Sequence, residues 1–194
     1  QAPFVTLENT ENKYGDQAQS SSGLIDDGPA LTAGDGRLTL AGTYIDVAGS
    51  IALNGFQMVH LDADSDIRLT DAVYYNNSNE LSWKGLLRTS QDLALTASRI
   101  YPTTLSDFTL ASDSGRIMTR RGKAAAGRPI VSAGGTVTLA ASQIDHQGYL
   151  AAPMGKIVFR GSLQDSIDSS ADTVFLGRGS MTTVASDSRV QYGY

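Results

Sequence analysis

The chain has 194 residues, a formal net charge of -5 and no cysteine. The lack of cysteine excludes disulfides, thiol catalysis and thiolate metal sites, and no apolar run approaches the roughly 18 residues that a membrane span needs. A mildly acidic chain also lacks the electrostatic footprint of a nucleic-acid-binding protein, so we expect no nucleic-acid partner.

The acidic residues are 17 aspartates and only three glutamates, and glycine occurs 20 times. Aspartate favours turns because it hydrogen-bonds its own nearby backbone, and glycine permits the positive φ of tight corners. A helical protein would instead carry glutamate, lysine and alanine in periodic blocks. The composition therefore predicts an all-β chain with many short turns.

The first 30 residues open with the apolar stretch 4–7 and then become strongly polar. We expect a strand followed by a polar surface loop or cap, and a frayed edge of a longer protein is the alternative. A turn signal at residues 27–29 then precedes the first regular repeat.

A single apolar pattern recurs along the chain. In each copy an aliphatic residue is followed seven positions later by the first of two aliphatic residues in an alternating segment, and seven positions after that residue by a further aliphatic residue. The alternating segments, RLTLA, DLALT and TVTLA, place two aliphatic side chains on one face of a strand. The copies consist of Leu31, Leu38, Leu40 and Ile45; of Leu86, Leu93, Leu95 and Ile100; and of Ile130, Val137, Leu139 and Ile144, with a partial copy at Leu150, Ile157 and Phe159.

Short strands and frequent turns favour a parallel solenoid over hairpins in register, with about 20 residues per coil. We treat residues 1–194 as a single β-helical domain. Within it, we expect residues 1–30 to form the N-terminal strand and polar loop or cap, 31–165 the repeat core, and 166–194 the terminal coils. The polar segment 119–129 interrupts the apolar pattern, so we expect it to leave its coil as a loop excursion.

Three aspartates, Asp62, Asp64 and Asp66, have the spacing that opens a calcium loop. The rest of the motif fails, because Ile67 stands where that loop needs glycine and Val73 where it needs a bidentate glutamate. We therefore expect these aspartates to alternate on the outward face of a strand, without a bound metal.

The two histidines, His60 and His146, have no cysteine or glutamate at ligand spacing, so zinc is not expected. We expect Asp145 and His146 to be exposed just after a strand and not to act in catalysis. No Gly-x-Ser-x-Gly motif marks a serine nucleophile. The sequence therefore predicts no catalytic residue, no cofactor and no metal site.

One basic segment departs from the acidic average of the chain and consists of Arg116, Arg120, Arg121, Lys123 and Arg128. Arginine binds carboxylate and sulfate groups bidentately, so this segment is the candidate site for an anionic ligand such as an acidic glycan. A solvated loop without a ligand is the alternative and the preferred interpretation.

Five segments together resemble a known family. They read AGDGRLTLAGTYI (33–45), SQDLALTASRI (90–100), AGGTVTLAASQI (133–144), GYLAAPMGKIVFRG (148–161) and GSMTTVASDSRVQYG (179–193). The combination resembles the filamentous haemagglutinin family, the large exoproteins of bacterial two-partner secretion systems. The amino-terminal Asn-Pro-Asn-Gly secretion signature of that family is not found, so we expect an internal or carboxy-terminal part of its repeat region.

The resemblance implies a right-handed parallel β-helix, secretion through a partner outer-membrane transporter, and a location outside the cell or on the bacterial surface. We expect a non-enzymatic structural and interaction segment of a large adhesin, which acts by surface display and by adhesion to a host receptor or glycan. Two alternatives stay open: a β-helical polysaccharide lyase or glycoside hydrolase that uses some of the many aspartates, and a glycan- or receptor-binding module that uses the basic segment.

Overall fold

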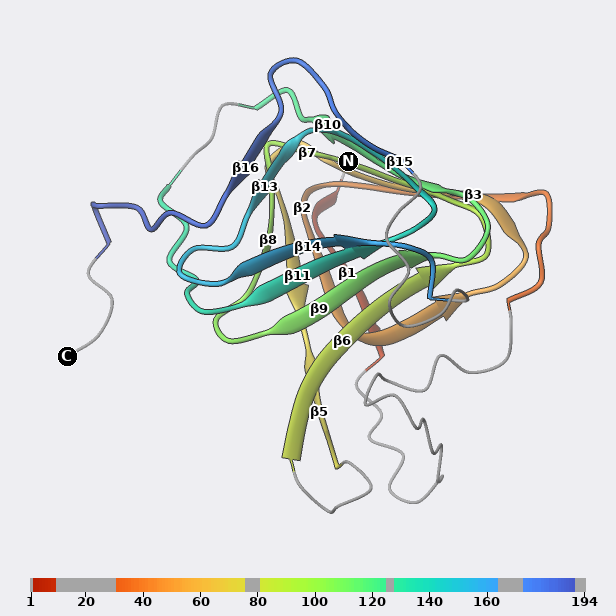
Figure 1. The fold of residues 1–194 in the computed structure, drawn as a ribbon, viewed down its shortest axis with the longest axis horizontal. Helices are drawn as coiled ribbons and strands as arrows, with labels where there is room; N and C mark the ends of the chain where they lie inside the picture. The colour runs from red at the N-terminus through yellow and green to blue at the C-terminus, as the bar shows by residue number, and fades with distance from the viewer. Residues whose placement is uncertain (1, 10–30, 76–80, 125–127, 164–172, 191–194) are drawn as a thin grey trace.

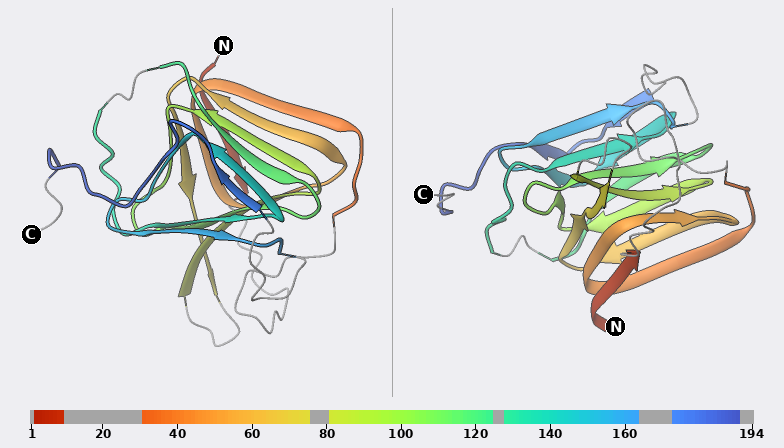
Figure 2. Two further views of the ribbon diagram at one scale, coloured as in Figure 1. Left: turned by 45° about the horizontal axis from the view of Figure 1, so that its top comes forward. Right: turned by 90° about the horizontal axis from the view of Figure 1, so that it is seen from below.

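The chain folds as an all-β solenoid in the computed structural model, which describes residues 2–9, 31–75, 81–124, 128–163 and 173–190. The strands wind into a right-handed parallel β-helix, so the predicted fold class is confirmed. Figures 1 and 2 show the coils stacked from the red N-terminal strand to the blue C-terminal strands. In the described residues no helix is long and apolar enough to cross a membrane.

Some expectations concern residues outside the described ranges. They are the polar loop or cap at 10–30, part of the loop excursion at 125–127, the end of the repeat core at 164–165, and the parts of the terminal coils at 166–172 and 191–194.

The strands form three faces of the β-helix. Face 1 contains the first part of β2 (Gly36–Leu53), β3 (Phe56–Ala63), β7 (Asp92–Ala97), β10 (Arg116–Arg121), β12 (Gln143–Gln147) and β15 (Thr173–Leu176). Face 2 contains β1 (Ala2–Asn9), the middle of β2, β4 (Asp66–Thr70), β8 (Arg99–Pro102), β13 (Tyr149–Ala151) and β16 (Met181–Thr183). Face 3 contains the end of β2, β6 (Leu81–Thr89), β9 (Asp107–Ser112), β11 (Thr136–Ala140) and β14 (Lys156–Arg160). Pairing within each face is parallel, and β5 (Ala72–Tyr75) pairs antiparallel with β6.

Strand β2 supplies all three faces of the first complete coil because it turns two corners while remaining extended. Residues 36–42 pair with β3, residues 45–48 with β4 and residues 50–53 with β6. The second corner falls at Gly49, whose φ is +78°. A Cβ at this position would lie 2.0 Å from the Asn9 carbonyl oxygen of β1, so both the φ and the close approach require glycine.

A continuous column of aliphatic side chains fills the inside of the coils. On face 1 the inward residues that stack from coil to coil are Leu38, Val59, Leu93, Ile117, Ile144 and Val174. Their spacings are 21, 34, 24, 27 and 30 residues, so the shortest coil is close to the expected length and the others carry longer connections. Full burial of one such side chain contributes about 1.5–3 kcal/mol, which makes the column the main stabilising element.

The third copy of the sequence repeat is displaced by one face from the other two. Leu93 and Ile100 of the second copy lie on faces 1 and 2. Val137 and Ile144, at the same positions of the third copy, lie on faces 3 and 1. The apolar alternation that makes a strand is identical on every face, so the pattern identifies strands without fixing which face each one joins.

The first aliphatic residue of the second and third copies lies outside the central column. Leu86 packs in a small cluster with Ala140, and Ile130 packs in another with Tyr101. Tyr101 follows the inward-facing Ile100 along β8, so it lies on the outer side of face 2. These residues therefore pack in small clusters on the outer side of the β-helix and do not belong to its interior column.

The loop excursion starts later than the expected segment 119–129. Residues 119–121 belong to β10, and the chain leaves the coil after Arg121 and returns at Thr136, where β11 begins. The excursion replaces the face 2 strand of its coil, and as a result Ile100 of β8 pairs directly with Leu150 of β13.

Arginine–aspartate pairs tie neighbouring coils together on the outside. They are Arg68–Asp46, Arg88–Asp113, Arg99–Asp66, Arg116–Asp92 and Arg120–Asp145. The Arg99–Asp66 pair is buried, with side chains only 8% and 5% exposed, and the Tyr101 hydroxyl donates to the same carboxylate. Burial, and then the Asp66 charge, raise the pKa of Tyr101 to about 12, so the phenol remains a neutral donor.

Candidate functional site

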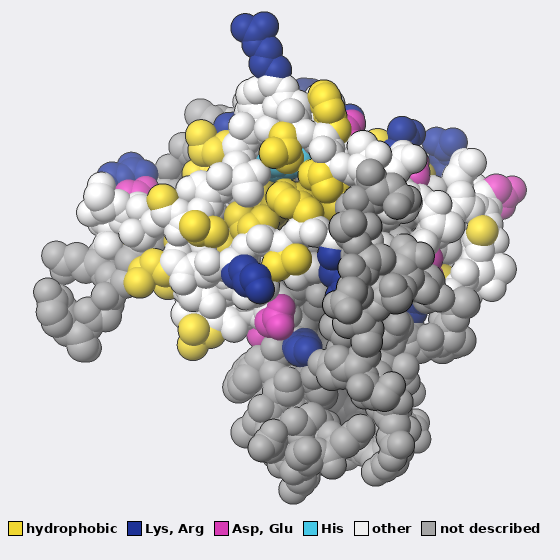
Figure 3. All heavy atoms as spheres, in the orientation of Figure 1, with side chains coloured by type: hydrophobic (Ala, Val, Ile, Leu, Met, Phe, Trp, Pro, Cys, Tyr) yellow, Lys and Arg dark blue, Asp and Glu magenta, His cyan; other side chains and the backbone are white. Residues whose placement is uncertain are grey.

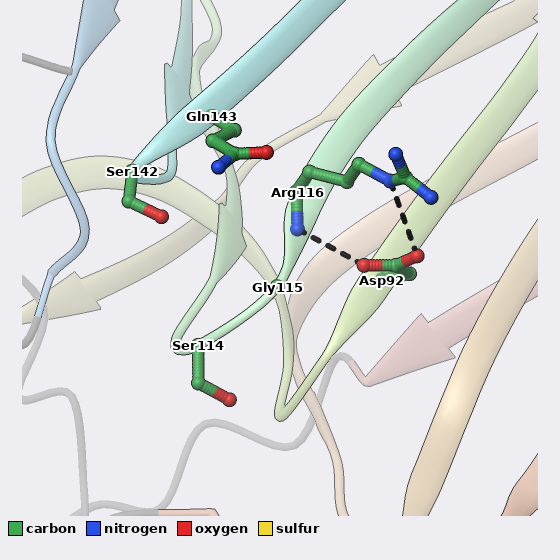
Figure 4. Close-up of a pocket in the computed structure, with 6 residues that line it drawn as sticks. All are labelled: Asp92, Ser114, Gly115, Arg116, Ser142 and Gln143. Atoms are coloured by element: carbon green, nitrogen blue, oxygen red, sulfur yellow. Dashed lines mark hydrogen bonds and ion pairs between the residues drawn. The ribbon is translucent and has the colours of Figure 1, made fainter. Parts of the chain in front are cut away.

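A polar groove of about 210 Å³ lies at the corner between faces 3 and 1 (Figure 4). This corner groove is lined by Asp92, Ser114, Gly115, Arg116, Ser142 and Gln143, which come from three successive coils. The backbone nitrogen and Nε of Arg116 donate to the Asp92 carboxylate over 3.1 and 3.4 Å. A Cβ at Gly115 would lie 2.6 Å from the Asp92 backbone nitrogen, so glycine allows the turn to sit directly on the coil beneath it.

The corner groove can hydrogen-bond a polar ligand but does not assemble a catalytic set. Its lining offers hydroxyl, amide and guanidinium groups together with one carboxylate, Asp92, which already accepts from Arg116. The Arg116 side chain is 53% exposed, so water screens this pair and its contribution to stability is small. Glycoside hydrolysis requires two carboxylates across a scissile bond, and the lining of this groove supplies one.

A second groove, of about 290 Å³, lies on the outer side of face 2 beside the excursion. This outer groove combines the apolar surfaces of Tyr149, Pro153 and Met181 with an ion pair between Asp187 and Arg189. Hydrogen bonds from the Arg189 side chain and backbone hold the pKa of Asp187 at about 2, so its carboxylate is ionised at physiological pH. The groove is therefore amphipathic, with charge at one side and an apolar lining.

The five basic residues of the predicted anionic-ligand site do not converge on one pocket. Arg116 and Arg120 are neutralised by aspartates of adjacent coils, at 3.4 Å from Asp92 and 2.6 Å from Asp145. The hydrogen bonds from Arg120 and Gln147 outweigh the opposing effect of burial and lower the pKa of Asp145. These two arginines therefore serve first as ties between coils.

The remaining three basic residues lie where the excursion leaves and rejoins the outer surface. The Arg121 guanidinium lies over the Tyr149 ring, 4.9 Å from its centroid, in a cation–π contact. Lys123 and Arg128 are exposed, and the Arg128 carbonyl accepts a hydrogen bond from the buried Arg99. The backbone of the excursion is thus anchored, while its charged side chains face solvent.

The three aspartates with calcium-loop spacing straddle a corner, so the prediction that they share the outward face of one strand is wrong. Asp62 lies in β3, Asp64 lies in the turn, and Asp66 begins β4. Asp66 is 3% exposed and is bound by Arg99, which explains its burial without a metal. In the described ranges no group of three His, Cys, Asp or Glu side chains could hold a metal ion.

His146 is completely buried, so the prediction that it is exposed is wrong. It follows the inward Ile144 by two positions on β12 and therefore points into the column. The Thr119 hydroxyl donates to Nδ1 over 2.6 Å, and Nε2 donates to the Met181 carbonyl oxygen over 3.2 Å, an arrangement that fits the neutral imidazole. Burial lowers the pKa of His146. The alternation of the segment QIDHQ was the sequence signal that places it inside.

No protein family, curated protein or solved structure matches the chain. The features that bear on function are therefore the fold and its surfaces. Those surfaces are the corner groove, the outer groove and the dispersed arginine–aspartate ties, all supported on a regular stack of coils.

Proposed function

We propose that the chain is a structural and interaction segment of a large secreted adhesin of the filamentous haemagglutinin type, which provides extended surface display and adhesion to cells. The observation that carries this proposal is the stack of parallel coils, in which interior strands pair with a coil on each side. A solenoid gains length by adding coils, because each coil contacts only its neighbours. The length of the solenoid is therefore not limited by the size of a single hydrophobic core.

The outer faces of the coils support a role in display. On β10 the inward Ile117 is buried, whereas the outward Arg116 and Arg120 side chains are 53% and 40% exposed. The column fixes the backbone, while substitutions at solvent-exposed positions of the outer face cost little stability. The exposed residues of such a surface, and with them the ligands that it binds, can change without loss of the fold.

In this function the chain is exported through the outer-membrane transporter of a two-partner secretion system and acts outside the cell or on the bacterial surface. The absence of cysteine favours such export, since no disulfide can form early and obstruct passage of the unfolded chain. Its ligand in adhesion is a host receptor or glycan.

Attachment of coated beads to cultured host cells tests the proposal. We expect beads that carry the folded chain to attach saturably, and beads that carry the misfolded Val137→Asp variant at equal density to attach no better than albumin-coated beads. Equal attachment with the parent and the Val137→Asp variant would mean that the β-helix itself is not the adhesive element.

A polysaccharide panel distinguishes the enzyme alternative. We expect no reducing ends or unsaturated products from acidic polysaccharides incubated with the chain. Turnover that one aspartate substitution abolishes would establish a lyase or hydrolase in place of an adhesin segment. A glycan array that compares the parent with an Arg120→Ala, Arg121→Ala double variant then tests whether the basic residues take part in recognition.

A further inference from the structure

The inward column contains one buried polar pair at a level where the other coils carry leucine. The second inward row of face 1 consists, from coil to coil, of Leu40, Leu61, Leu95, Thr119, His146 and Leu176. Thr119 and His146 are completely buried, and the Thr119 hydroxyl donates to Nδ1 of the imidazole. A buried polar pair of this kind can be replaced by apolar side chains without loss of stability, so the pair points to a role other than packing.

His146 connects its own coil to the next one through the interior. Its Nε2 donates to the carbonyl oxygen of Met181, the first residue of β16, over 3.2 Å. The Gly177 amide donates to the His146 carbonyl oxygen and the Met181 amide to that of Gly148, both over 2.9 Å. The corner at residues 177–180 of the last coil is thus held at both ends by the segment that contains His146. We call this contact between β12–β13 and β15–β16 the joint.

The charged groups around the ring do not neutralise a cation at the joint. Asp145 points to the outer side of β12 and is tied to Arg120 over 2.6 Å, and the positive charge of Arg121 opposes protonation. On the other sides lie Phe159 of β14, whose charged residues point outward, and the strands β15 and β16, which carry no ionisable side chain. Figure 3 shows hydrophobic side chains gathered on the side of the molecule toward which these strands lie in Figure 1. A protonated imidazole would therefore be a buried cation without a facing carboxylate.

Opening of the joint gives the imidazole access to water and removes this penalty. In the closed joint burial lowers the pKa of His146 and outweighs the bond to Met181 and the Asp145 charge, which raise it. In the open joint the pKa returns to about 6.5, so the open form takes up the proton first. Opening is therefore independent of pH above about 6.5, and at pH 5 its equilibrium constant is larger by up to about 30-fold.

We propose that His146 makes the joint an acid-sensitive switch, in which protonation of the imidazole releases the last coil while the coils before it stay folded. Each coil of a solenoid contacts only its neighbours, so one coil can open without the others. Release uncovers Ile144 and Leu150, which pair with Val174 and Thr182 in the closed form. Further coils stacked on β15 and β16 would leave the joint in place, so the switch does not depend on where the chain ends.

Amide hydrogen exchange of the isotope-labelled whole chain, followed by NMR from about pH 7.5 to about pH 5, tests the proposal. The probes are the amides of Gly177 and Met181 at the joint and the amide of Ser98, which donates to the Ser65 carbonyl in the middle coils over 2.7 Å. After correction for the intrinsic exchange rate, we expect the protection of Gly177 and Met181 to fall by about 10- to 30-fold as the pH is lowered. At each pH both should be less protected than Ser98 by about tenfold or more, because their exchange requires only one coil to open.

The variant His146→Leu removes the titrating group and restores the residue that the same row carries in other coils. We expect the protection of Gly177 in this variant to be independent of pH. The matched control is His60→Gln, a half-buried position on the outer side of face 1, which should keep the full pH dependence. If His146→Leu folds poorly, the ring resonance of His146 in the parent gives a second readout, and it should not titrate near pH 6.5 while Gly177 stays protected.

A fall in protection of less than about threefold in the parent, or a full fall that persists in His146→Leu, would overturn the proposal. Equal protection of Gly177 and Ser98 would show that the chain opens only as a whole, which also contradicts it. Loss of the pH dependence in His60→Gln would assign the effect to the other histidine. Titration of the His146 ring near pH 6.5 in the closed joint would mean that the cation is accommodated without release.

Discussion

Inward aliphatic side chains are buried in the middle coils of the β-helix but exposed in its last coil. In β10 and β12 the inward Ile117 and Ile144 are 0% and 2% exposed, whereas in β15 the inward Val174 and Leu176 are 40% and 57% exposed. Val174 occupies the register position of Ile117 and Ile144, and Leu176 occupies that of His146, which is completely buried. Burial in a solenoid is thus a property of neighbouring coils, and the same substitution should have very different effects in the two regions.

A charge placed in the column gives the largest expected difference. Val137→Asp buries an unpaired carboxylate at a site that is 0% exposed, and we expect a loss of about 4 kcal/mol or more, which abolishes cooperative folding. Val174→Asp, at the open end, should cost less than about 1 kcal/mol because the carboxylate keeps its water. Urea unfolding followed by circular dichroism measures both. Equal losses would mean that the last coil is covered in solution.

The buried ion pair between Arg99 and Asp66 gives the next largest effect. Arg99→Met leaves the Asp66 carboxylate, 3% exposed, without its cation, and we expect a loss of about 3–5 kcal/mol. The double variant Arg99→Met, Asp66→Leu should recover most of it, because no buried charge then remains. Arg116→Met, at the exposed pair with Asp92, should change the urea midpoint very little. A double variant as unstable as the single one would show that Arg99 acts mainly through its bond to the excursion.

A pH titration tests the contact between the middle coils and the last coil, where His146 hydrogen-bonds the Met181 carbonyl oxygen of the last coil. Burial lowers the pKa of His146 below its ordinary value of 6.5, so the unfolded chain takes up the proton first. Stability should therefore be constant above pH 6.5 and fall below it, by at most about 1.4 kcal/mol per pH unit, until the folded-state pKa is reached.

His146→Leu is the matched variant for this titration, because Leu61 and Leu95 occupy the equivalent inward positions of other coils. Urea midpoints between pH 7.5 and pH 5 should lose their slope in this variant. An unchanged slope would assign the pH dependence to carboxylates and not to His146.

The smallest effect is expected at the outer surface. Arg120→Ala removes a pair with Asp145 whose side chains are 40% and 29% exposed, and it should cost less than about 0.5 kcal/mol. The difference from the parent should vanish in high salt, which screens the pair. A loss above about 1 kcal/mol that persists in salt would show that the ties between coils are structural elements in their own right.

The sequence predicted the class of fold because apolar alternation is a local signal. TVTLA and DLALT each form a strand, β11 and β7, whose aliphatic residues point inward. The face on which each strand lies depends on the lengths of the connections between strands, and these lengths vary from coil to coil. The repeat pattern alone therefore did not predict that the third copy is displaced by one face from the other two. The excursion was expected from the polar segment, but its start was not, because Thr119 continues the inward row of β10.

The candidate site was harder to predict because its partners are distant in sequence. Arg116 and Arg120 read as a basic cluster, yet their aspartates lie 24 and 25 residues away, one coil before and one coil after. The register between strands determines which side chains meet in such pairs, and no local sequence pattern specifies that register. The outer groove likewise joins Tyr149 to Met181 and Arg189 through the register of β13 with β16. His146, in contrast, was predictable from the alternation of its own strand.

The missing face 2 strand beside the excursion also determines the path of the molecule. From the second coil to the last, face 1 holds β3, β7, β10, β12 and β15, while face 2 holds β4, β8, β13 and β16. Neighbouring strands are spaced by about 4.8 Å, so face 2 is shorter by about one such step. The axis of the solenoid therefore curves toward face 2 at this point. In a fibre built from such coils, a single surface loop sets the direction in which everything beyond it points.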